Sequence, residues 1–468
     1  MSNKIKRAIV SISDKSEIKL ILKTLKKYKV DILSSGGTSK EIKKLGFKCT
    51  EVSEYTNTKE ILDGRVKTLH PMLYAGILSK RENKKHKREL KKNNYQEIDL
   101  VIVNFYPFEE TLKSTKNHLK LIENIDIGGP TLVRAAAKNY NNTTVLTSPH
   151  QYKEFILDLE KNRGSTSLEF RKKLSQEAFN LTAYYDSVIS EYLSFENKNN
   201  FPQKKTIHGN LVEVLRYGEN PHQQSAIYSK NNSLDIFQLS GKKLSYNNYN
   251  DIYAALNISK TLPKNTGTVI VKHANPCGVS VNKNKTESYK EALSCDPISA
   301  FGGIVSCNFK VNKKIALELS KIFLEVIIAL GFDKVSLKIL KKKKNLRLID
   351  ASKLKGDNLS NITSNFNSLL LQNVDNKIFS KDNFKVVSKI KPSKKIFNDL
   401  LFAFNVCRNV KSNAIVLTKN SSTIGIGSGQ PSRLDSCKIA IEKMKKFQKI
   451  NEDDLILGAS DAFFPFID

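Results

Sequence analysis

Apolar positions in residues 1–193 fall into two patterns that alternate along the chain. Short continuous apolar runs, which are typical of buried strands, occur at 7–13, 30–35, 100–108 and 143–148. Runs with apolar residues three or four positions apart, which are typical of helices, occur at 14–28, 130–139 and 166–193. This alternation predicts an α/β domain with a mostly parallel sheet flanked by helices.

A polar stretch without periodicity, SFENKNNFPQKKTIHGN at 194–210, follows the last of these helices and predicts a linker. We therefore expect two domains, 1–199 and 200–468. Strands and helices mix again in the second domain, and glycines mark the strand ends in ISAFGGIVS (298–306) and IGIGSGQPSR (424–433).

A lysine and a histidine stand together at the end of an apolar run in GTVIVKHANPCG, residues 267–278. The run predicts a buried strand, and Asn275-Pro276 with Gly278 predict the turn that ends it. Because a buried charge without a partner is costly, Lys272 and His273 are candidates for chemistry. A histidine satisfied within the fold and a lysine that reaches solvent would give the same pattern.

Composition changes this picture in two ways. The net charge of +31 suits a nucleic-acid-binding protein or an enzyme with a polyanionic substrate, but the lysines are spread widely and no nucleic-acid-binding motif accompanies them. The six cysteines are scattered without a C-x-x-C pair, so we expect free thiols and no metal. With no apolar stretch long enough for a bilayer and no cleavage site near the N-terminus, we expect a cytoplasmic protein.

A glycine turn leads from a predicted strand into a predicted helix in SSGGTSKEI, residues 34–42. Thr38 and Glu41 have the spacing of a capping box, and Gly36 and Gly37 let a ligand approach the backbone. Free amides at a helix start bind anions, so this turn is a candidate phosphate site. An ordinary strand-to-helix turn would look the same.

Cations and a hydroxyl cluster in DGRVKTLHP, where Arg65, Lys67, Thr68 and His70 lie within six positions. Alternation would place Arg65 and Lys67 on one face of an extended segment, which suits a phosphate or a developing oxyanion. A charged surface loop is the alternative.

Two further stretches carry weaker signals. In IDIGGPTLVRAAAKN (125–139), Asp126 precedes a helix on which Arg134 and Lys138 lie four apart, although Lys138 could simply complement the helix C-terminus. In IGIGSGQPSRLD (424–435), Ser432 and Asp435 could cap a helix, and Arg433 at its opening could hold an anionic or heteroaromatic ligand.

Taken together, these motifs resemble a known family. SISDKS, SSGGT, LDGRVKTLHP, NFYPF and IDIGGPTLVRAAAKN resemble, in this order, the inosine monophosphate (IMP) cyclohydrolase domain of the bifunctional purine-biosynthesis enzymes. LRYGENPHQ, KHANPCG, AFGG, LEVIIA, ILKKKKNLRL, VKSNAI, GIGSGQPSR and SDAFFPF resemble the second domain of that family, the aminoimidazole-carboxamide ribonucleotide (AICAR) transformylase. The resemblance implies a methylglyoxal-synthase-like (MGS-like) first domain and a cytidine-deaminase-like α/β second region in two subdomains.

The resemblance also implies two reactions of de novo purine synthesis. The amine of AICAR takes the formyl group of 10-formyltetrahydrofolate, and the product, FAICAR, then closes its ring with loss of water to give IMP. The folate is a co-substrate, and neither step calls for a metal or a redox cofactor. The family further implies a homodimer whose transformylase sites are built across the interface.

For the transformylase, the resemblance implies that His273 takes the proton from the amine, that Lys272 stabilises charge at the formyl carbonyl, and that Asn413 holds the formyl oxygen or the attacking amine. The implied nucleotide contacts are Arg216, Tyr217, Gly302 and Glu325. The implied folate contacts are Arg433 and Phe463.

For the cyclohydrolase, the resemblance implies that Lys138 is the acid or base, with Lys67, Tyr106 and Asp126 stabilising charge and positioning the amide. The phosphate would lie on the SSGGT turn, Lys67 and Thr68. The remaining implied contacts of the nucleotide are Ser13, Lys15, Ser35, Gly36, Gly37, Thr38, Arg65 and Asn104.

Three departures from the family pattern concern the second domain. Leu330 replaces a proline, Asn405 replaces a lysine, and the chain ends at Ile467-Asp468 where the family continues past FFPF. We therefore expect the usual C-terminal segment to be missing, and a cyclohydrolase with a decayed or truncated transformylase is the alternative. A basic nucleic-acid-binding protein is the alternative from another class.

Overall fold

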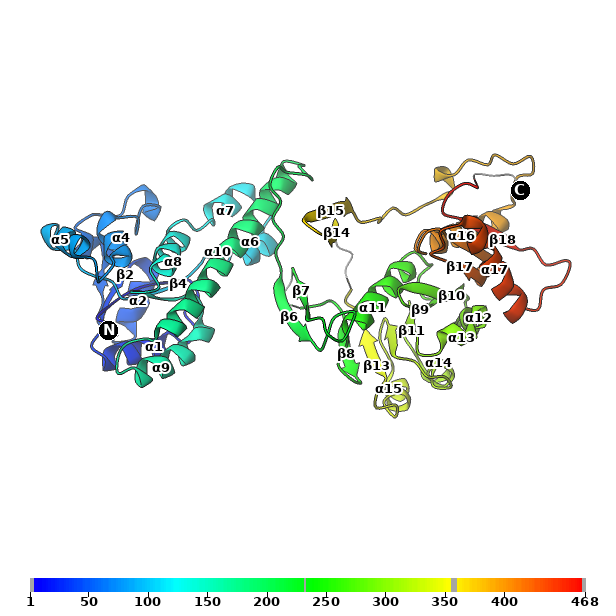
Figure 1. The fold of residues 1–468 in the computed structure, drawn as a ribbon, viewed down its shortest axis with the longest axis horizontal. Helices are drawn as coiled ribbons and strands as arrows, with labels where there is room; N and C mark the ends of the chain where they lie inside the picture. The colour runs from blue at the N-terminus through cyan, green and yellow to red at the C-terminus, as the bar shows by residue number, and fades with distance from the viewer. Residues whose placement is uncertain (1–3, 231–232, 355–359, 465–468) are drawn as a thin grey trace. The chain divides into compact units, whose positions relative to one another are not determined.

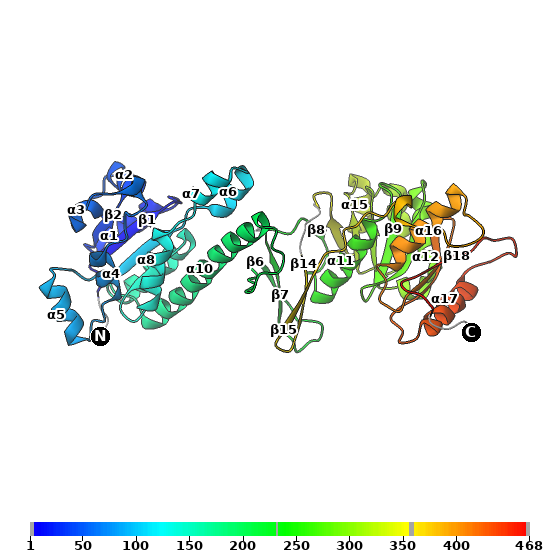
Figure 2. The same cartoon turned by 90° about the horizontal axis from the view of Figure 1, so that it is seen from above.

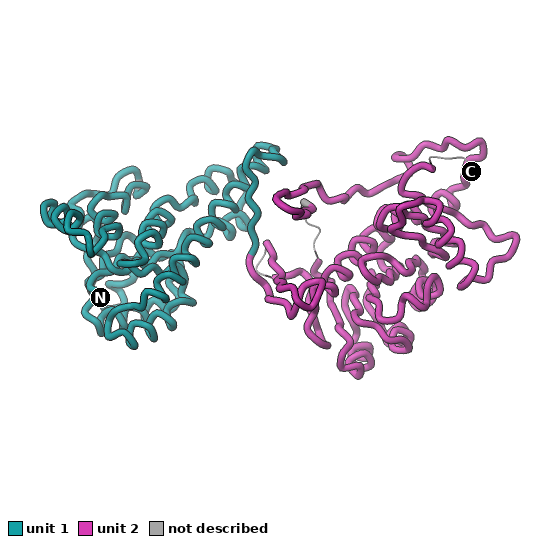
Figure 3. The backbone as a smooth tube through the Cα atoms, in the orientation of Figure 1, with its two compact units in different colours: residues 1–209 teal, residues 210–468 magenta. Residues whose placement is uncertain are grey.

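The computed structural model describes residues 4–230, 233–354 and 360–464, so Ile467 and Asp468 lie outside the described residues. The chain forms two compact units, 1–209 and 210–468 (Figure 3). Within the described ranges, no helix combines the length and the apolar character that crossing a bilayer requires.

Unit 1 is an α/β domain. Its elements are β1 (Arg7–Ile12), α1 (Ile18–Lys27), β2 (Asp31–Ser34), α2 (Gly36–Lys44), β3 (Thr50–Glu51), α3 (Val52–Thr56), η1 (Leu62–Gly64), α4 (Pro71–Leu78), α5 (Lys84–Lys92), β4 (Leu100–Asn104), α6 (Phe108–Ser114), α7 (His118–Glu123), α8 (Gly128–Lys138), β5 (Thr144–Leu146), η2 (Pro149–Gln151), α9 (Tyr152–Lys161) and α10 (Leu168–Glu196).

The sheet of unit 1 has the strand order β3-β2-β1-β4-β5, and every pair is parallel. α8 packs on β4 and β5 and lies beside α10, while α1 packs against α9 (Figures 1 and 2). The strand order reverses direction between β1 and β4, and in such sheets ligands bind outside the carboxyl ends of the strands at this point. The predicted parallel sheet flanked by helices is confirmed.

Unit 2 mixes strands and helices. Its elements are β6 (Asn210–Leu215), β7 (Ser225–Ser229), β8 (Phe237–Ser240), α11 (Tyr246–Ser259), β9 (Gly267–Lys272), β10 (Asn275–Val281), α12 (Lys285–Cys295), α13 (Pro297–Ala300), β11 (Ile304–Cys307), α14 (Lys313–Leu319), β12 (Val326–Ala329), α15 (Lys334–Leu340), β13 (Arg347–Asp350), β14 (Ser360–Asn365), β15 (Ser368–Asn373), η3 (Lys381–Asn383), α16 (Lys394–Cys407), β16 (Ile415–Lys419), β17 (Ser422–Gly427), α17 (Arg433–Phe447) and β18 (Leu457–Ser460).

The main sheet of unit 2 is mixed and has the order β18-β16-β17-β10-β9-β11-β12-β13-β8, and β6-β7 and β14-β15 form two further two-stranded sheets. Side chains alternate between the two faces of the main sheet: Val269 and Val271 enter one apolar cluster, while Ile270 enters the other. Both faces are thus buried, which explains why β9 is a continuous apolar run in the sequence. The main sheet has a separate apolar core on each face.

The turn predicted at Asn275, Pro276 and Gly278 is wrong. β9 ends at Lys272 and pairs with β10 from Asn275 onward, so His273 and Ala274 form the two-residue turn. Pro276 and Gly278 lie inside β10, where the register shifts between them. Gly278 does not form the turn but allows α12 to pack closely on β10, because a Cβ there would stand 1.9 Å from the Ala292 carbonyl oxygen.

Three local predictions from the sequence are also wrong. Arg65 is not in an extended segment, because it follows the 3-10 turn η1 with φ −62° and ψ −28°. Thr38 does not cap α2, because the helix begins at Gly36 and Ser35 takes the N-cap position. Ser432 holds the N-cap position of α17, but within the described residues its side chain makes no capping bond.

Candidate active sites

The carboxyl ends of β1 and β4 in unit 1 are tied together by one side chain. The Asn104 Oδ1 accepts hydrogen bonds from the backbone amides of Ser13 (2.6 Å) and Asp14 (2.9 Å), and Nδ2 donates to the Asp14 carbonyl at 3.1 Å. Thr38 fixes the start of α2 in the same region, because its buried hydroxyl bonds both the amide and the carbonyl of Ile12 at 3.0 Å. Asn104 and Thr38 thus shape the loop at the strand-order reversal.

The ammonium of Lys67 lies over the start of α2. A Cβ on Gly36 would stand 2.1 Å from Lys67 Nζ, so only a glycine allows this approach, and its φ of 51° also favours glycine. A cation beside the free amides of a helix start suits a phosphate. Lys67 also forms an ion pair with Glu60 at 3.1 Å.

A second group gathers at the start of α8. The Asp126 carboxylate accepts hydrogen bonds from the amides of Gly129 (2.8 Å) and Tyr106 (3.4 Å), and buried Thr68 places its hydroxyl 2.8 Å from the position of a Cβ on Gly128. These two hydrogen bonds lower the pKa of Asp126, but burial has the larger effect and raises it overall. The carboxyl is therefore easier to protonate than a free one, while the Tyr106 side chain is 54% exposed and available to a ligand.

Four other predicted residues of unit 1 lie apart from these contacts. Lys15 is exposed in the loop after β1, and Gly37 is exposed in the first turn of α2. Arg65 forms an ion pair with Glu123 of α7. Lys138 ends α8, ten residues after Gly128, which places its Cα about 15 Å along the helix from the Thr68 contact.

The candidate residues of unit 2 meet at one edge of its sheet. β9 ends and β10 begins at this edge, and the register places the starts of β11, β12, β13 and β16 and the ends of β17 and β18 there as well. Residues far apart in sequence are thereby brought together by strand pairing.

The Lys272–His273 pair lies at the centre of this edge. Lys272 Nζ donates to the Phe301 carbonyl at 2.9 Å, next to Gly302, and the His273 side chain is exposed. His273 and Ala274 have φ of 51° and 58°, a left-handed turn that costs about 1–3 kcal/mol for each non-glycine residue. Asp251 of α11 supports it, since its Oδ1 accepts from the Ala274 amide at 2.7 Å.

Glu325 lies at the same edge of the sheet, just before β12, which is two strands from β9. Its Oε2 accepts hydrogen bonds from Arg347 Nη1 (2.9 Å) and from Asn248 Nδ2 (3.2 Å). Arg347 also lines a pocket of about 400 Å³ together with Arg216 and Tyr217, which contact each other through a cation–π interaction at 5.6 Å. The other lining residues are Glu213, Val214, Lys242, Lys243, Leu244 and Ser245. Four cations make this pocket suited to an anionic ligand.

Asn413 and Arg433 belong to a hydrogen-bonded network on the other side of the hairpin. Asn413 Nδ2 donates to the carbonyls of Gln430 (2.8 Å) and Pro431 (2.9 Å), and its Oδ1 accepts from Arg433 Nη2 at 2.7 Å. Arg433 also pairs with Asp461, which binds the Ser412 hydroxyl. Burial alone would raise the pKa of Asp461, but the hydrogen bonds from Ser412 and Arg433 outweigh it and lower the pKa.

Phe463 follows this network with its side chain 80% exposed. Cys277, in the same motif as His273, is buried, and burial raises its pKa to about 12. Its thiol therefore stays protonated and is a poor nucleophile. Within the described ranges, no three His, Cys, Asp or Glu side chains gather in a way that would hold a metal ion.

Comparison with known proteins identifies the family. Residues 136–443 match the family described as "AICARFT/IMPCHase bienzyme", and residues 17–131 match the MGS-like domain. The bifunctional purine biosynthesis protein PurH of Persephonella marina is 43% identical over 99% of this chain and 91% of its own length. This chain belongs to the PurH family. PurH of Acetivibrio thermocellus (43%, 99% and 91%) and of Prochlorococcus marinus (44%, 98% and 90%) are similarly close.

The PurH-family assignment confirms the resemblance seen in the sequence and the expected fold, with an MGS-like first domain and an α/β second region. It identifies the chain as a bifunctional enzyme of purine biosynthesis that acts on small molecules. It does not test individual site residues, which stay predictions.

Sequence reasoning missed several residues that hold the predicted ones in place. Asp251, Arg347 and Asp461 contact Ala274, Glu325 and Arg433 respectively. Tyr185 of α10 accepts a hydrogen bond from the Asp126 amide at 2.9 Å. Asp461 and Arg347 lie inside motifs that carried the family resemblance, and this position was the signal by which the sequence could have indicated them. Asp251 and Tyr185 stand in ordinary helical patterns without such a signal.

Proposed function

We propose that unit 2 transfers the formyl group of 10-formyltetrahydrofolate to AICAR and that unit 1 closes FAICAR to IMP. The supporting observation is that strand pairing in unit 2 brings the expected residues to one edge of the main sheet. In unit 2 these are Lys272, His273, Gly302 and Glu325, with Asn413 and Arg433 nearby. In unit 1, Thr38 bonds Ile12 at the end of β1, and Lys67 lies over Gly36 at the start of α2.

In unit 2, His273 takes the proton from the weakly nucleophilic amine as this amine attacks the formyl carbon. Its exposed position on a fixed turn suits this task, since an imidazole works as a base near neutral pH. Lys272 stabilises negative charge at the formyl oxygen. The new C–N bond replaces the bond to the folate nitrogen, and tetrahydrofolate leaves with a proton, so no electrons are exchanged with a cofactor.

The hydrogen bonds of Asn413 favour one of its two expected roles. Both Nδ2 protons are already donated to backbone carbonyls, so no donor remains for the formyl oxygen. Among the residues that the structure describes, only Arg433 donates to Oδ1, which keeps a lone pair for an amine proton. We therefore assign Asn413 to the attacking amine, and Arg433 and Phe463 to the folate.

In unit 1, ring closure is intramolecular, so orientation of the formamide against the carboxamide supplies much of the rate. Lys67, Thr68 and the start of α2 hold the phosphate, and Tyr106 and Asp126 position the amide and stabilise charge. Lys138 remains the candidate acid or base, and its Cα–Cβ bond points back along α8 toward Asp126. The elements of water leave without a change in oxidation state.

Product analysis of the wild-type chain tests this assignment. With FAICAR alone, we expect IMP from unit 1. With AICAR and 10-formyltetrahydrofolate, we expect FAICAR first and IMP after it. IMP from FAICAR without any formylation of AICAR would support the cyclohydrolase-only alternative instead.

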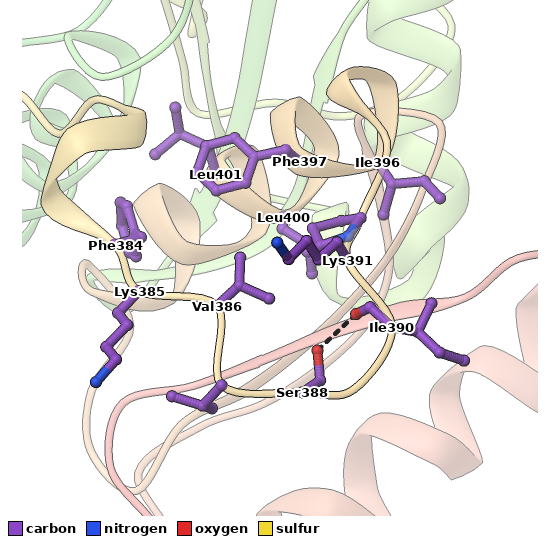
Figure 4. A pocket seen from close by; sticks show the side chains of 12 residues that line it. Phe384, Lys385, Val386, Ser388, Ile390, Lys391, Ile396, Phe397, Leu400 and Leu401 are labelled. Carbon is purple, nitrogen blue, oxygen red and sulfur yellow. Dashed lines mark hydrogen bonds between the residues drawn. The ribbon is translucent and has the colours of Figure 1, made fainter.

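We further propose a homodimer in the cytoplasm. Apolar side chains are exposed along one segment of unit 2, including Leu370 (63%), Ile378 (91%) and Val387 (88%). The same segment and the first half of α16 enclose an apolar pocket of about 470 Å³ (Figure 4). Exposed apolar surface of this kind supports an interface. Sedimentation equilibrium should give twice the chain mass of 52.8 kDa, and a monomer at micromolar concentration would contradict it.

A further inference from the structure

We propose that Asp251 is a positioning residue of the transformylase site, holding the His273–Ala274 turn in the conformation that presents His273. This inference rests on the proposed role of His273 as the base. It concerns a side chain on α11, a helix that lies beside β9 (Figure 1).

The turn needs support from outside because its own residues do not favour it. Two-residue hairpin turns with positive φ at both positions strongly prefer Asn, Asp or Gly. This chain has His273 and Ala274 there, with φ of 51° and 58°. Histidine tolerates positive φ better than most non-glycine residues, but alanine does not, so the turn gains from a group outside it that stabilises the backbone.

Asp251 supplies that support through the backbone amides of the turn. Its Oδ1 accepts from the Ala274 amide at 2.7 Å, and the His273 amide lies close enough to the same carboxyl to lower its pKa. Burial raises the pKa of Asp251, and these two amides and the nearby His273 ring lower it again. One carboxylate therefore binds the Ala274 amide and faces the His273 amide, so it supports both residues of the turn.

The same face of α11 reaches the second half of the site. Asn248 and Asp251 are three residues apart and thus neighbours on one helical face, and Asn248 bonds Glu325 at 3.2 Å. On the opposite side of the turn, Asn275 Nδ2 donates to the His273 carbonyl at 3.2 Å. The turn is therefore held at the Ala274 amide and at the His273 carbonyl, while the His273 imidazole remains exposed.

Two substitutions separate the hydrogen-bonding role from a role of charge. Asp251→Asn keeps a carbonyl oxygen that can accept from the amides, so we expect kcat/KM for formyl transfer to fall by less than about tenfold. Asp251→Ala removes the acceptor, and displacement of His273 should lower kcat by roughly 100-fold with a smaller change in KM for AICAR. Ring closure of FAICAR in unit 1 should keep its wild-type rate in both variants and reports the amount of active chain, and denaturant unfolding followed by a probe in unit 2 is the control for folding around Asp251.

A rescue experiment tests the mechanism itself. Glycine adopts positive φ without steric cost, so Ala274→Gly should restore a large part of the formyl-transfer rate in the Asp251→Ala background. Hydrogen–deuterium exchange of peptides covering 267–278 should be faster in Asp251→Ala than in wild type. In Asp251→Asn it should be slower than in Asp251→Ala. This exchange reports on the turn even without turnover.

Three results would overturn the inference: an Asp251→Ala variant with wild-type kcat, an Asp251→Asn variant as impaired as Asp251→Ala, or unchanged exchange at the turn. Failure of the proposed function looks different. In that case His273→Ala itself would retain formyl transfer, whatever the effect of Asp251.

Discussion

Two aspartates of unit 2 show how single side chains fix the geometry around the site. Asp251 is half-buried with backbone amides as partners, and burial raises its pKa. Asp296 is buried at the start of α13, where it bonds the Ser299 amide (2.9 Å) and hydroxyl and pairs with Lys443 of α17 at 2.7 Å. Burial alone would raise the pKa of Asp296, but the hydrogen bonds from Lys443 and Ser299 lower it overall.

Substitution of Lys443 tests the energetic role of this pair. Lys443→Met leaves the buried Asp296 carboxylate without its cation, so we expect unit 2 to lose about 2 kcal/mol of unfolding free energy. Chemical denaturation followed by a probe in unit 2 measures it. Lys438→Met on the same helix removes an exposed lysine and should change stability by less than about 0.5 kcal/mol.

The pH dependence of this difference gives an independent check. Because the folded pKa of Asp296 lies below its ordinary value of 3.8, the stabilisation is present above that pH and is lost as the pH falls through the folded pKa. The unfolding curves of wild type and Lys443→Met should therefore converge on acidification below pH 3.8. A difference that stays constant or grows in acid would contradict the ion-pair account.

At the scale of elements, the start of α2 shows how a helix end becomes a candidate phosphate site. Gly36 has a positive φ and lies under the Lys67 ammonium, whereas a Cβ on Gly37 would meet nothing within 4 Å. The two neighbouring glycines therefore have different roles, although nothing in the SSGGT motif distinguishes one from the other.

This difference is measurable as stability. Gly36→Ala should destabilise unit 1 by about 1–3 kcal/mol, because alanine is strained at positive φ and its Cβ displaces Lys67. Gly37→Ala should be neutral or stabilise by up to about 1 kcal/mol, since alanine favours a helix. Thermal unfolding of both variants measures the effect, and equal effects would mean that α2 starts differently from the structure described here.

The elements themselves were largely predictable, but their ends were not. Continuous apolar runs identified β1, β2, β4, β5 and β9, because strands buried on both faces leave this pattern. The hairpin turn was missed because His273-Ala274 is not a typical turn sequence, whereas Pro276 and Gly278 are typical turn residues. In the structure, Pro276 and Gly278 lie at a register shift inside β10, and Gly278 packs closely against α12. Local signals fail where a site or a close contact overrides them.

At the scale of the whole molecule, strand order decides which residues meet. Family motifs indicated His273, Glu325 and Asn413 individually, but their common sheet edge follows from the pairing of β9 with β11 and of β16 with β17. Asp251 meets the turn only because α11 packs on β9. Such long-range contacts have no signature in the spacing of residues, so the supporting residues became visible only in the structure.

The central claim is that each unit carries one of the two reactions, and paired variants test it most directly. We would measure formyl transfer from 10-formyltetrahydrofolate to AICAR, and separately ring closure of FAICAR, for wild type, His273→Ala and Lys67→Ala. The account predicts that His273→Ala abolishes formyl transfer and leaves ring closure intact, whereas Lys67→Ala slows ring closure and still produces FAICAR. Loss of ring closure in His273→Ala, or formyl transfer that survives it, would contradict the account.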